Sequence, residues 1–187
     1  MSSYFWLNII ILGGLKIDIE EVKANFDNKE FILNAVKQQG KFLEFASHEL
    51  QDEREVVKAA LEQDGESLEF ASTRLKDDKE IVLLAIQSAP WTACYASDKL
   101  KADKDVIRES VKTYGQTLYF ASEELRDDEE IVKLAVSNKG IIIKFASLRL
   151  RDNAEIASIA IKQNKIAYHY ISQRLKNDEE IKKLLEM

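Results

Sequence analysis

Apolar and polar positions recur along this chain with a fixed spacing of 25 residues. Each repeat holds an aromatic residue, then a small residue followed by serine, and then a leucine three positions after the serine. The pairs are Ala46-Ser47, Ala71-Ser72, Ala96-Ser97, Ala121-Ser122 and Ala146-Ser147, and Ile171-Ser172 continues the series. Six registers without an insertion indicate a tandem repeat of stacked structural units.

Each unit is predicted to form two short helices. The first follows an acid-rich start, in which Asp or Asn stands three residues before a glutamate, as in a capping box. The predicted caps are Asp27, Asp52, Asp77, Asp127, Asp152 and Asn177. A glycine is then predicted to end the helix in a left-handed conformation, at Gly40, Gly65, Gly115 and Gly140.

The second helix is predicted from residues at the spacing i, i+3, i+4 and i+7, such as Leu68, Ala71, Ser72 and Leu75. The serine hydroxyl is expected to bond to the carbonyl four residues earlier in its own helix. A hairpin of this length buries too little surface to fold alone, so neighbouring units must stack. The sequence therefore predicts an all-α solenoid of six 25-residue helical-hairpin repeats with atypical terminal caps.

We expect one cooperative domain with an N-terminal cap or degenerate repeat at 1–25, six repeats at 26–175 and a C-terminal capping helix at 176–187. The apolar run from Tyr4 to Leu12 lacks the basic flank of a signal peptide and is too short to span a membrane. A buried helix or strand is predicted there. The alternative is an interfacial anchor, and self-association through this segment is a further hypothesis.

Composition and charge narrow the class of protein. With 187 residues, 45% of them hydrophobic and one proline, the chain can bury a core. Its net charge of −6 repels polyanions, so nucleic acid is not the expected partner. The single cysteine, Cys94, suits a reducing compartment, and we expect a cytoplasmic protein.

Candidate catalytic and metal-binding groups are sparse. The two histidines, His48 and His169, lie far apart in the series of repeats, and the serines have no histidine at a repeated offset. The acidic runs, such as that from Asp127 to Glu130, recur where each helix begins and lack the glycine of a calcium loop. We therefore expect no enzyme activity, no cofactor and no metal site.

Three columns of the repeat vary most: those six and three residues before the serine and one residue after it. We call the surface that they form the variable face, and it is predicted to bind a partner because several members near its middle are apolar. The alternative is a solvated face, which also varies. The predicted binding residues are Trp91, Cys94, Tyr119, Glu123, Ile141, Lys144 and Leu148.

The third unit departs most from the pattern, because Pro90 replaces the glycine and Trp91 follows it. Proline has no left-handed conformation, so an altered turn is predicted to present Trp91 beside Cys94 and Tyr119. Ala102 at a cap position and Lys165 at a glycine position are the other departures.

The repeat resembles domain-of-unknown-function family 4116. The resemblance is carried by Asp127 to Val136, Gly140, Phe145-Ala146-Ser147 and Leu150, and it extends over residues 26 to 187. It implies a tandem helical architecture and supplies no activity. The predicted function is a non-catalytic scaffold that binds a protein. The alternatives are a nucleic-acid-binding helical repeat protein and an accessory subunit or fragment of a multidomain enzyme.

Overall fold

Each 25-residue unit folds into three helical segments. The computed structural model describes residues 17–186, which begin with the short helix α2 (Ile19–Ala24). The longest segment of each unit is an α-helix: α3 (Lys29–Gln38), α5 (Arg54–Gln63), α7 (Lys79–Ser88), α9 (Lys104–Val111), α11 (Glu129–Asn138), α13 (Ala154–Gln163) and finally α15 (Glu179–Glu186).

The second predicted helix is divided into two pieces. The first is a 3-10 helix: η1 (Gly40–Phe45), η2 (Gly65–Phe70), η3 (Pro90–Tyr95), η4 (Gly115–Tyr119), η5 (Gly140–Phe145) and η6 (Lys165–Tyr170). The second is a single α-helical turn: α4 (His48–Gln51), α6 (Thr73–Lys76), α8 (Asp98–Lys101), α10 (Glu123–Arg126), α12 (Leu148–Arg151) and α14 (Gln173–Lys176). The division falls at the alanine–serine pair, whose backbone is extended, with φ −68° and ψ 158° at Ala146.

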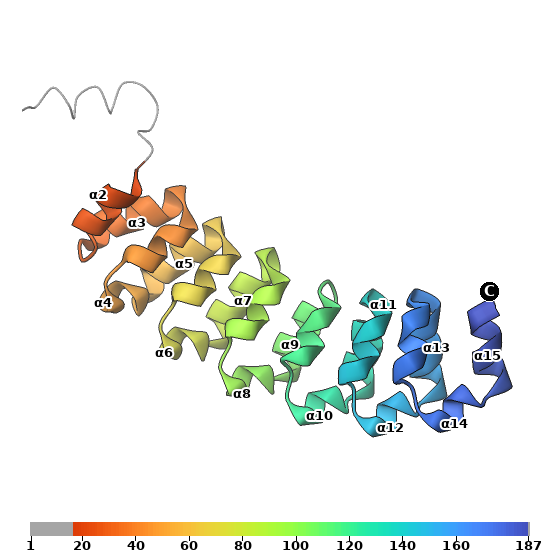
Figure 1. Cartoon of the computed structure of the whole chain (residues 1–187). Coiled ribbons are helices and arrows are strands. Elements are labelled where there is room, and N and C mark those ends of the chain that lie inside the picture. The colour runs from red at the N-terminus through yellow and green to blue at the C-terminus, as the bar shows by residue number, and fades with distance from the viewer. Residues whose placement is uncertain (1–16, 187) are drawn as a thin grey trace, which may run out of the picture.

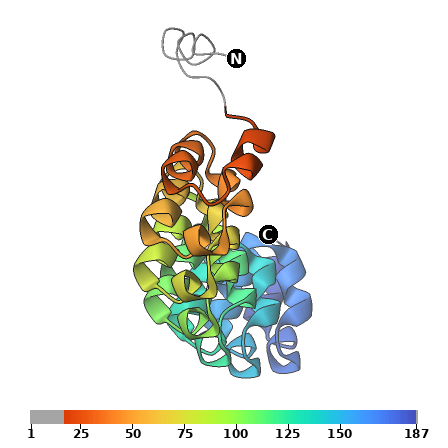
Figure 2. The ribbon, with the colours of Figure 1, turned by 90° about the vertical axis from the view of Figure 1, so that its left-hand side faces the viewer.

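The units stack side by side in one curved row, which confirms the predicted all-α solenoid (Figure 1). Long helices contact long helices of the next unit, and the 3-10 helices contact one another in the same way. The single-turn helices α4 to α14 follow one edge of the row (Figure 1). Viewed from its N-terminal side, the row bends, so that the C-terminal units lie to one side of the first ones (Figure 2).

The core runs between the long helices and the 3-10 helices. Its repeated members include an alanine that is fully buried in five units and a leucine on each single-turn helix. The alanines are Ala35, Ala60, Ala85, Ala135 and Ala160. Burying one leucine or isoleucine side chain stabilises the fold by about 1.5–3 kcal/mol. Because each such residue contacts the next unit, this stabilisation depends on stacking.

The helix caps lie one residue later than predicted. Asp78 and Asp128 accept hydrogen bonds from the backbone N–H groups of Ile81 and Ile131, at 3.3 and 3.1 Å. The predicted cap residues just before them serve another purpose. Asp127 accepts a hydrogen bond from the hydroxyl of Ser147 in the following unit, and Asp52, Asp77 and Asp152 accept from Ser72, Ser97 and Ser172 in the same way.

The prediction that the serine hydroxyl bonds within its own helix is also wrong. Ser147 caps α12 by accepting from the N–H of Leu150 at 3.2 Å while its hydroxyl hydrogen goes to Asp127. Its backbone N–H donates to the carbonyl of Arg126 at 2.9 Å, and the same backbone bond recurs at each of the six serines. We call these contacts the serine ladder: Ser47 to Phe26, Ser72 to Gln51, Ser97 to Lys76, Ser122 to Lys101, Ser147 to Arg126 and Ser172 to Arg151.

The glycines are required by close packing and not by a left-handed backbone. None of the four has a positive φ, and the residue before Gly140 is extended, with φ −148°. A Cβ atom on Gly140 would collide with the carbonyl oxygen of Ala160 in the next unit, and the other three glycines face Ala60, Ala85 and Ala135 in the same manner. Each glycine N–H also donates to a side chain of the next unit, as Gly115 does to Asn138 at 2.9 Å.

The junction between the third and fourth units lacks both kinds of side-chain contact. Pro90 has no N–H to donate, and its carbonyl instead accepts from the hydroxyl of Ser110 at 2.7 Å. Ala102 offers no carboxylate to Ser122, although the backbone bond of the serine ladder persists at 3.1 Å. Proline begins η3 without breaking it, because a first-turn proline needs no donor.

The predicted roles of the Tyr4 to Leu12 segment lie outside the described residues. The part of the first 25 residues that the structure describes forms α2, whose start has the full capping box that the sequence pattern predicts elsewhere. Asp18 accepts from the N–H of Glu21 at 2.9 Å, and Glu21 accepts from the N–H of Asp18 at 3.2 Å.

Candidate protein-binding face

The variable face consists of the 3-10 helices and the first residue of each single-turn helix. Of the predicted binding residues, Glu123, Lys144 and Leu148 are exposed, as are Trp91 and Tyr119. Leu148 is 78% exposed and Tyr119 is 56% exposed, which is high for such large apolar side chains. Cys94 and Ile141 are half-buried.

Tyr119 lies at the centre of an aromatic cluster that spans two units. Its ring packs against Phe120 of its own unit, with centroids 5.0 Å apart, and against Phe145 of the next unit at 4.8 Å. The ammonium group of Lys144 lies 4.8 Å from the centroid of the Phe145 ring, within the range of a cation–π interaction. The structure thus brings Tyr119 and Lys144 together around Phe145, a residue that the variable columns do not include.

Trp91 belongs to a separate aromatic pair. Its ring meets Tyr114 edge to face, with centroids 6.2 Å apart, and this contact crosses the junction between the third and fourth units. Trp91 remains 41% exposed. The predicted altered turn is wrong, because Ala89 before Pro90 has φ −137° and ψ 81°, close to the φ −129° and ψ 80° of Tyr114 before Gly115. The aromatic contacts of Tyr119 are with Phe120 and Phe145, so the two predicted anchors occupy different clusters along the face.

The N-terminal half of the face is acidic. Lys41 forms an ion pair with Glu66 across the first junction, and this bond lowers the pKa of the Glu66 carboxyl. Further along, Glu69 accepts a hydrogen bond from the hydroxyl of Tyr95 at 3.0 Å. Burial, together with this carboxylate, raises the pKa of Tyr95 to about 12.

Cys94 is poorly suited to act as a nucleophile. Burial raises the pKa of its thiol, and Lys101 opposes that effect only in part. A thiol with a raised pKa forms little of the reactive thiolate at neutral pH. The chemistry of this side chain is therefore that of a packing residue.

The repeat is also visible in comparisons with known proteins. The family described as Domain of unknown function (DUF4116) matches six overlapping segments: residues 28–76, 53–101, 78–126, 103–151, 128–176 and 153–184. The chain belongs to the DUF4116 family. No curated protein and no solved structure matches it.

Successive matches to the DUF4116 family begin 25 residues apart, so the family unit and the structural unit have the same length. Each of the first five matches extends over nearly two units, from one long helix to the end of the second single-turn helix that follows it, and the sixth ends within α15. This length agrees with the geometry, because the bonds of the serine ladder join each DUF4116 unit to its neighbour.

Sequence reasoning missed a hollow of about 300 Å³ between α10 and α12 on the variable face of the DUF4116 solenoid. Its lining includes the predicted residues Glu123 and Leu148, together with Phe145, Arg126 and Arg151. The two arginines precede the acid of their unit, in the column Gln51, Lys76, Lys101, Arg126, Arg151 and Lys176. The change from lysine to arginine in two successive units is the signal that could have indicated them.

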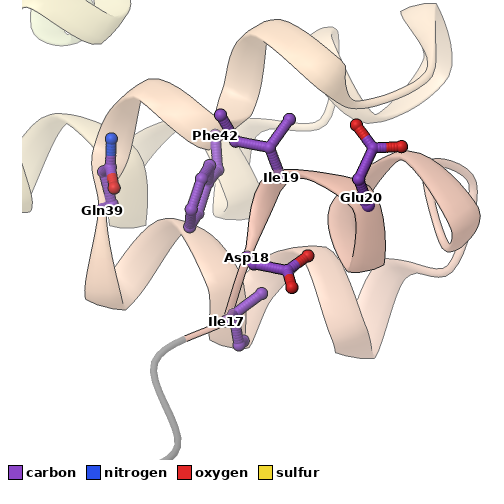
Figure 3. Close-up of a pocket in the computed structure, with 6 residues that line it drawn as sticks. All are labelled: Ile17, Asp18, Ile19, Glu20, Gln39 and Phe42. Atoms are coloured by element: carbon purple, nitrogen blue, oxygen red, sulfur yellow. The ribbon is translucent and has the colours of Figure 1, made fainter.

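A second hollow, of about 510 Å³, lies at the N-terminal end of the DUF4116 solenoid (Figure 3). It is lined by the segment that leads into α2, with Ile17 and Asp18, and by Phe42 of η1. Within residues 17–186, no group of three or more acidic, histidine or cysteine side chains is arranged to hold a metal ion. No helix in that range is long and apolar enough to cross a membrane.

Proposed function

We propose that the chain is a non-catalytic scaffold that binds a partner protein along the variable face. The observation that carries the proposal is the exposure of Tyr119 and Leu148 in the folded chain, together with the neighbouring Ile166, which is 51% exposed. Exposed apolar groups of this size that lie along one face are typical of binding surfaces. Tyrosine and tryptophan are also the residue types that dominate interface energetics.

The opposite side of the solenoid supports this assignment by contrast. There, the cations that begin the long helices pair with acids of the next unit, as Lys79 does with Asp103 and Asp105, both at 2.9 Å. Lys104 continues the series with Asp128 at 2.7 Å. These charges are engaged within the chain, whereas the large apolar side chains of the variable face are left for a partner. The single cysteine suits the cytoplasm, where we place this scaffold.

The test is an affinity capture with three immobilised proteins: wild type, Trp91→Ala with Tyr119→Ala, and the matched control Gln87→Ala with Lys162→Ala on the long helices. We expect the variable-face variant to lose the captured partner, with binding weaker by about 2 kcal/mol or more, while the control retains it. Leu148→Ser serves as a second variant whose exposed position leaves folding unaffected.

Unfolding curves recorded for the same proteins decide between a binding role and a core role. Under the proposal, the denaturation midpoint of the Trp91→Ala, Tyr119→Ala protein stays close to that of wild type. A protein that unfolds several kcal/mol more easily and still binds normally once folded would make these side chains part of the core and refute the proposed face.

A further inference from the structure

In four of the six units, the last residue of the single-turn helix donates a hydrogen bond to a backbone carbonyl. Lys76 donates to the carbonyl of Glu69 at 2.6 Å, and Lys176 donates to that of His169 at 2.8 Å. Gln51 and Arg151 also donate to carbonyls, the latter to Tyr170 at 2.6 Å. In these four units, the polar end of the side chain therefore lies over a 3-10 helix and has a hydrogen-bond acceptor there.

Arg126 departs from this pattern. Its Nε atom is shielded from solvent and has no hydrogen-bond acceptor, although the side chain as a whole is one-third exposed. The nearest acid, Glu123, lies 3.9 Å from Nη2, beyond hydrogen-bond distance. A shielded Nε is out of reach of a ligand, so the groups of Arg126 that an incoming oxygen atom can meet are its Nη amino groups, which make no hydrogen bond within residues 17–186.

The Arg126 side chain lines the hollow between α10 and α12. One wall carries Phe145 and the 78%-exposed Leu148, and Arg151 adds a second guanidinium. Tyr119 extends the apolar wall through its contact with Phe145. The hollow therefore combines an apolar surface with two cationic side chains, at the end of the solenoid where the charge becomes positive.

We propose that this hollow binds a peptide segment of the partner in which a carboxylate lies beside a bulky apolar side chain. The inference rests on the proposed function and names the chemistry of the bound segment. The carboxylate accepts from the Nη groups of Arg126 in a charge-assisted hydrogen bond. The apolar side chain covers Leu148 and Phe145.

Charge complementarity favours an acidic segment over a basic one. Residues 126–150 carry five cations and four anions, and residues 151–175 carry four cations and two anions, in contrast to residues 51–75 with three cations and seven anions. Within the hollow itself, Arg126 and Arg151 outnumber Glu123. Because Glu123 is 91% exposed at the rim, an incoming carboxylate must compete with it. Glu123→Gln is therefore expected to tighten binding.

The test uses the full chain and a phage library of random 12-residue peptides. The enriched peptides are expected to carry Asp or Glu next to Leu, Ile, Phe or Trp. A synthetic copy of one enriched peptide should bind Arg126→Gln or Leu148→Ser about tenfold more weakly than wild type. Lys76→Gln and Thr73→Ala, which change the same two columns in the second unit, should bind it as wild type does. Circular dichroism confirms that each variant is folded.

The outcomes separate this inference from the proposed function. Enriched peptides that are basic or uncharged, or whose affinity is unchanged in Arg126→Gln and Leu148→Ser, refute the binding of an acidic segment in the hollow. If those peptides still depend on Trp91 and Tyr119, the proposed binding face stands without this site. If no peptide is enriched over a blank surface, the inference fails, and the partner capture alone then decides the proposed function.

Discussion

The hydroxyl of Ser147 donates to the carboxylate of Asp127, which stands 20 residues earlier in the preceding unit. The same serine oxygen accepts from the N–H of Leu150, so one side chain both caps a helix and joins two units. Arg149 completes the contact, with its Nε 3.0 Å from the Asp127 carboxylate and its Nη2 2.7 Å from the Asp127 carbonyl. Four of the six serines therefore combine a helix cap with a side-chain bond to the preceding unit.

Ser147→Ala should destabilise the chain by about 1–2 kcal/mol, because it removes a helix cap and the bond to the preceding unit. Ser137→Ala, on the exposed side of α11, is the matched control and should change the free energy of unfolding by less than about 0.5 kcal/mol. Urea denaturation of the three proteins measures both values. Equal midpoints for Ser147→Ala and wild type would mean that the Ser147 hydroxyl adds no stability.

Gly140→Ala should cost about 1–3 kcal/mol, because the added methyl group collides with the Ala160 carbonyl of the next unit. Lys165 occupies the same column in the last unit and is exposed, so Lys165→Ala should be nearly neutral. Thermal unfolding distinguishes the two variants. A neutral Gly140→Ala would show that neighbouring units can separate enough to admit a methyl group.

Ala121→Leu should cost about 1–3 kcal/mol by overpacking, because Ala121 is 5% exposed and packed in the core. The same change at Ala154, which is exposed at the start of α13, provides the control and should leave the urea midpoint nearly unchanged. An unchanged midpoint for Ala121→Leu would contradict the assignment of this column to the buried face.

Acid should weaken the bonds between serine hydroxyls and aspartate carboxylates of neighbouring units. The Ser72 hydroxyl and then Arg74 lower the pKa of the Asp52 carboxyl below its ordinary value of 3.8, and Asp127 and Asp152 are lowered by the equivalent partners. A lowered pKa in the folded state gives stability that is present above the ordinary pKa and is lost as the pH falls through the folded value.

The denaturation midpoint of wild type should therefore fall below about pH 4. Asp127→Asn with Asp152→Asn should lower the midpoint at pH 7 and flatten its decline in acid, so that the two curves converge once the pH lies below the lowered pKa of these two carboxyls. Parallel curves for the two proteins would exclude these carboxylates as a source of the acid sensitivity.

The junction at Ala102 allows a designed repair. Where four junctions pair an acid with a basic residue, as Asp127 does with Arg149, this junction has Ala102 opposite Glu124. Ala102→Asp alone would bring two carboxylates together and should not stabilise the chain. Ala102→Asp with Glu124→Arg should raise the urea midpoint above that of wild type and of either single variant. A double variant with no gain over the two single changes would show that the acid–arginine pair does not strengthen a junction.

Much of the fold could be predicted from the sequence, because a constant 25-residue period indicates identical units that stack on one another. The helical class, the unit length and the exposure of Tyr119 and Leu148 could be predicted, since they depend on spacing within a unit. The cap was misplaced by one residue because two adjacent acids, such as Asp127 and Asp128, are both able to cap a helix.

Contacts between units were harder to predict. The role of Gly140 depends on Ala160, and the second role of Ser147 depends on Asp127, each 20 residues away along the chain. The hollow at Arg126 depends on how side chains of two neighbouring units pack, and residue spacing within a unit carries no information on that packing. Sequence patterns within one unit therefore predict the helices but do not predict the hydrogen bonds between units.

Near-identical junctions also create a problem for a folding chain, because a serine that reaches the wrong unit would find the same carbonyl and carboxylate partners. The junction between Pro90 and Ser110 breaks this degeneracy, since a proline without an N–H meets a hydroxyl in a column where other units place alanine. Of the junctions that the structure describes, this one has chemistry that no other unit can reproduce. This junction can therefore fix the register in which the units stack, and it disfavours shifted or domain-swapped pairings.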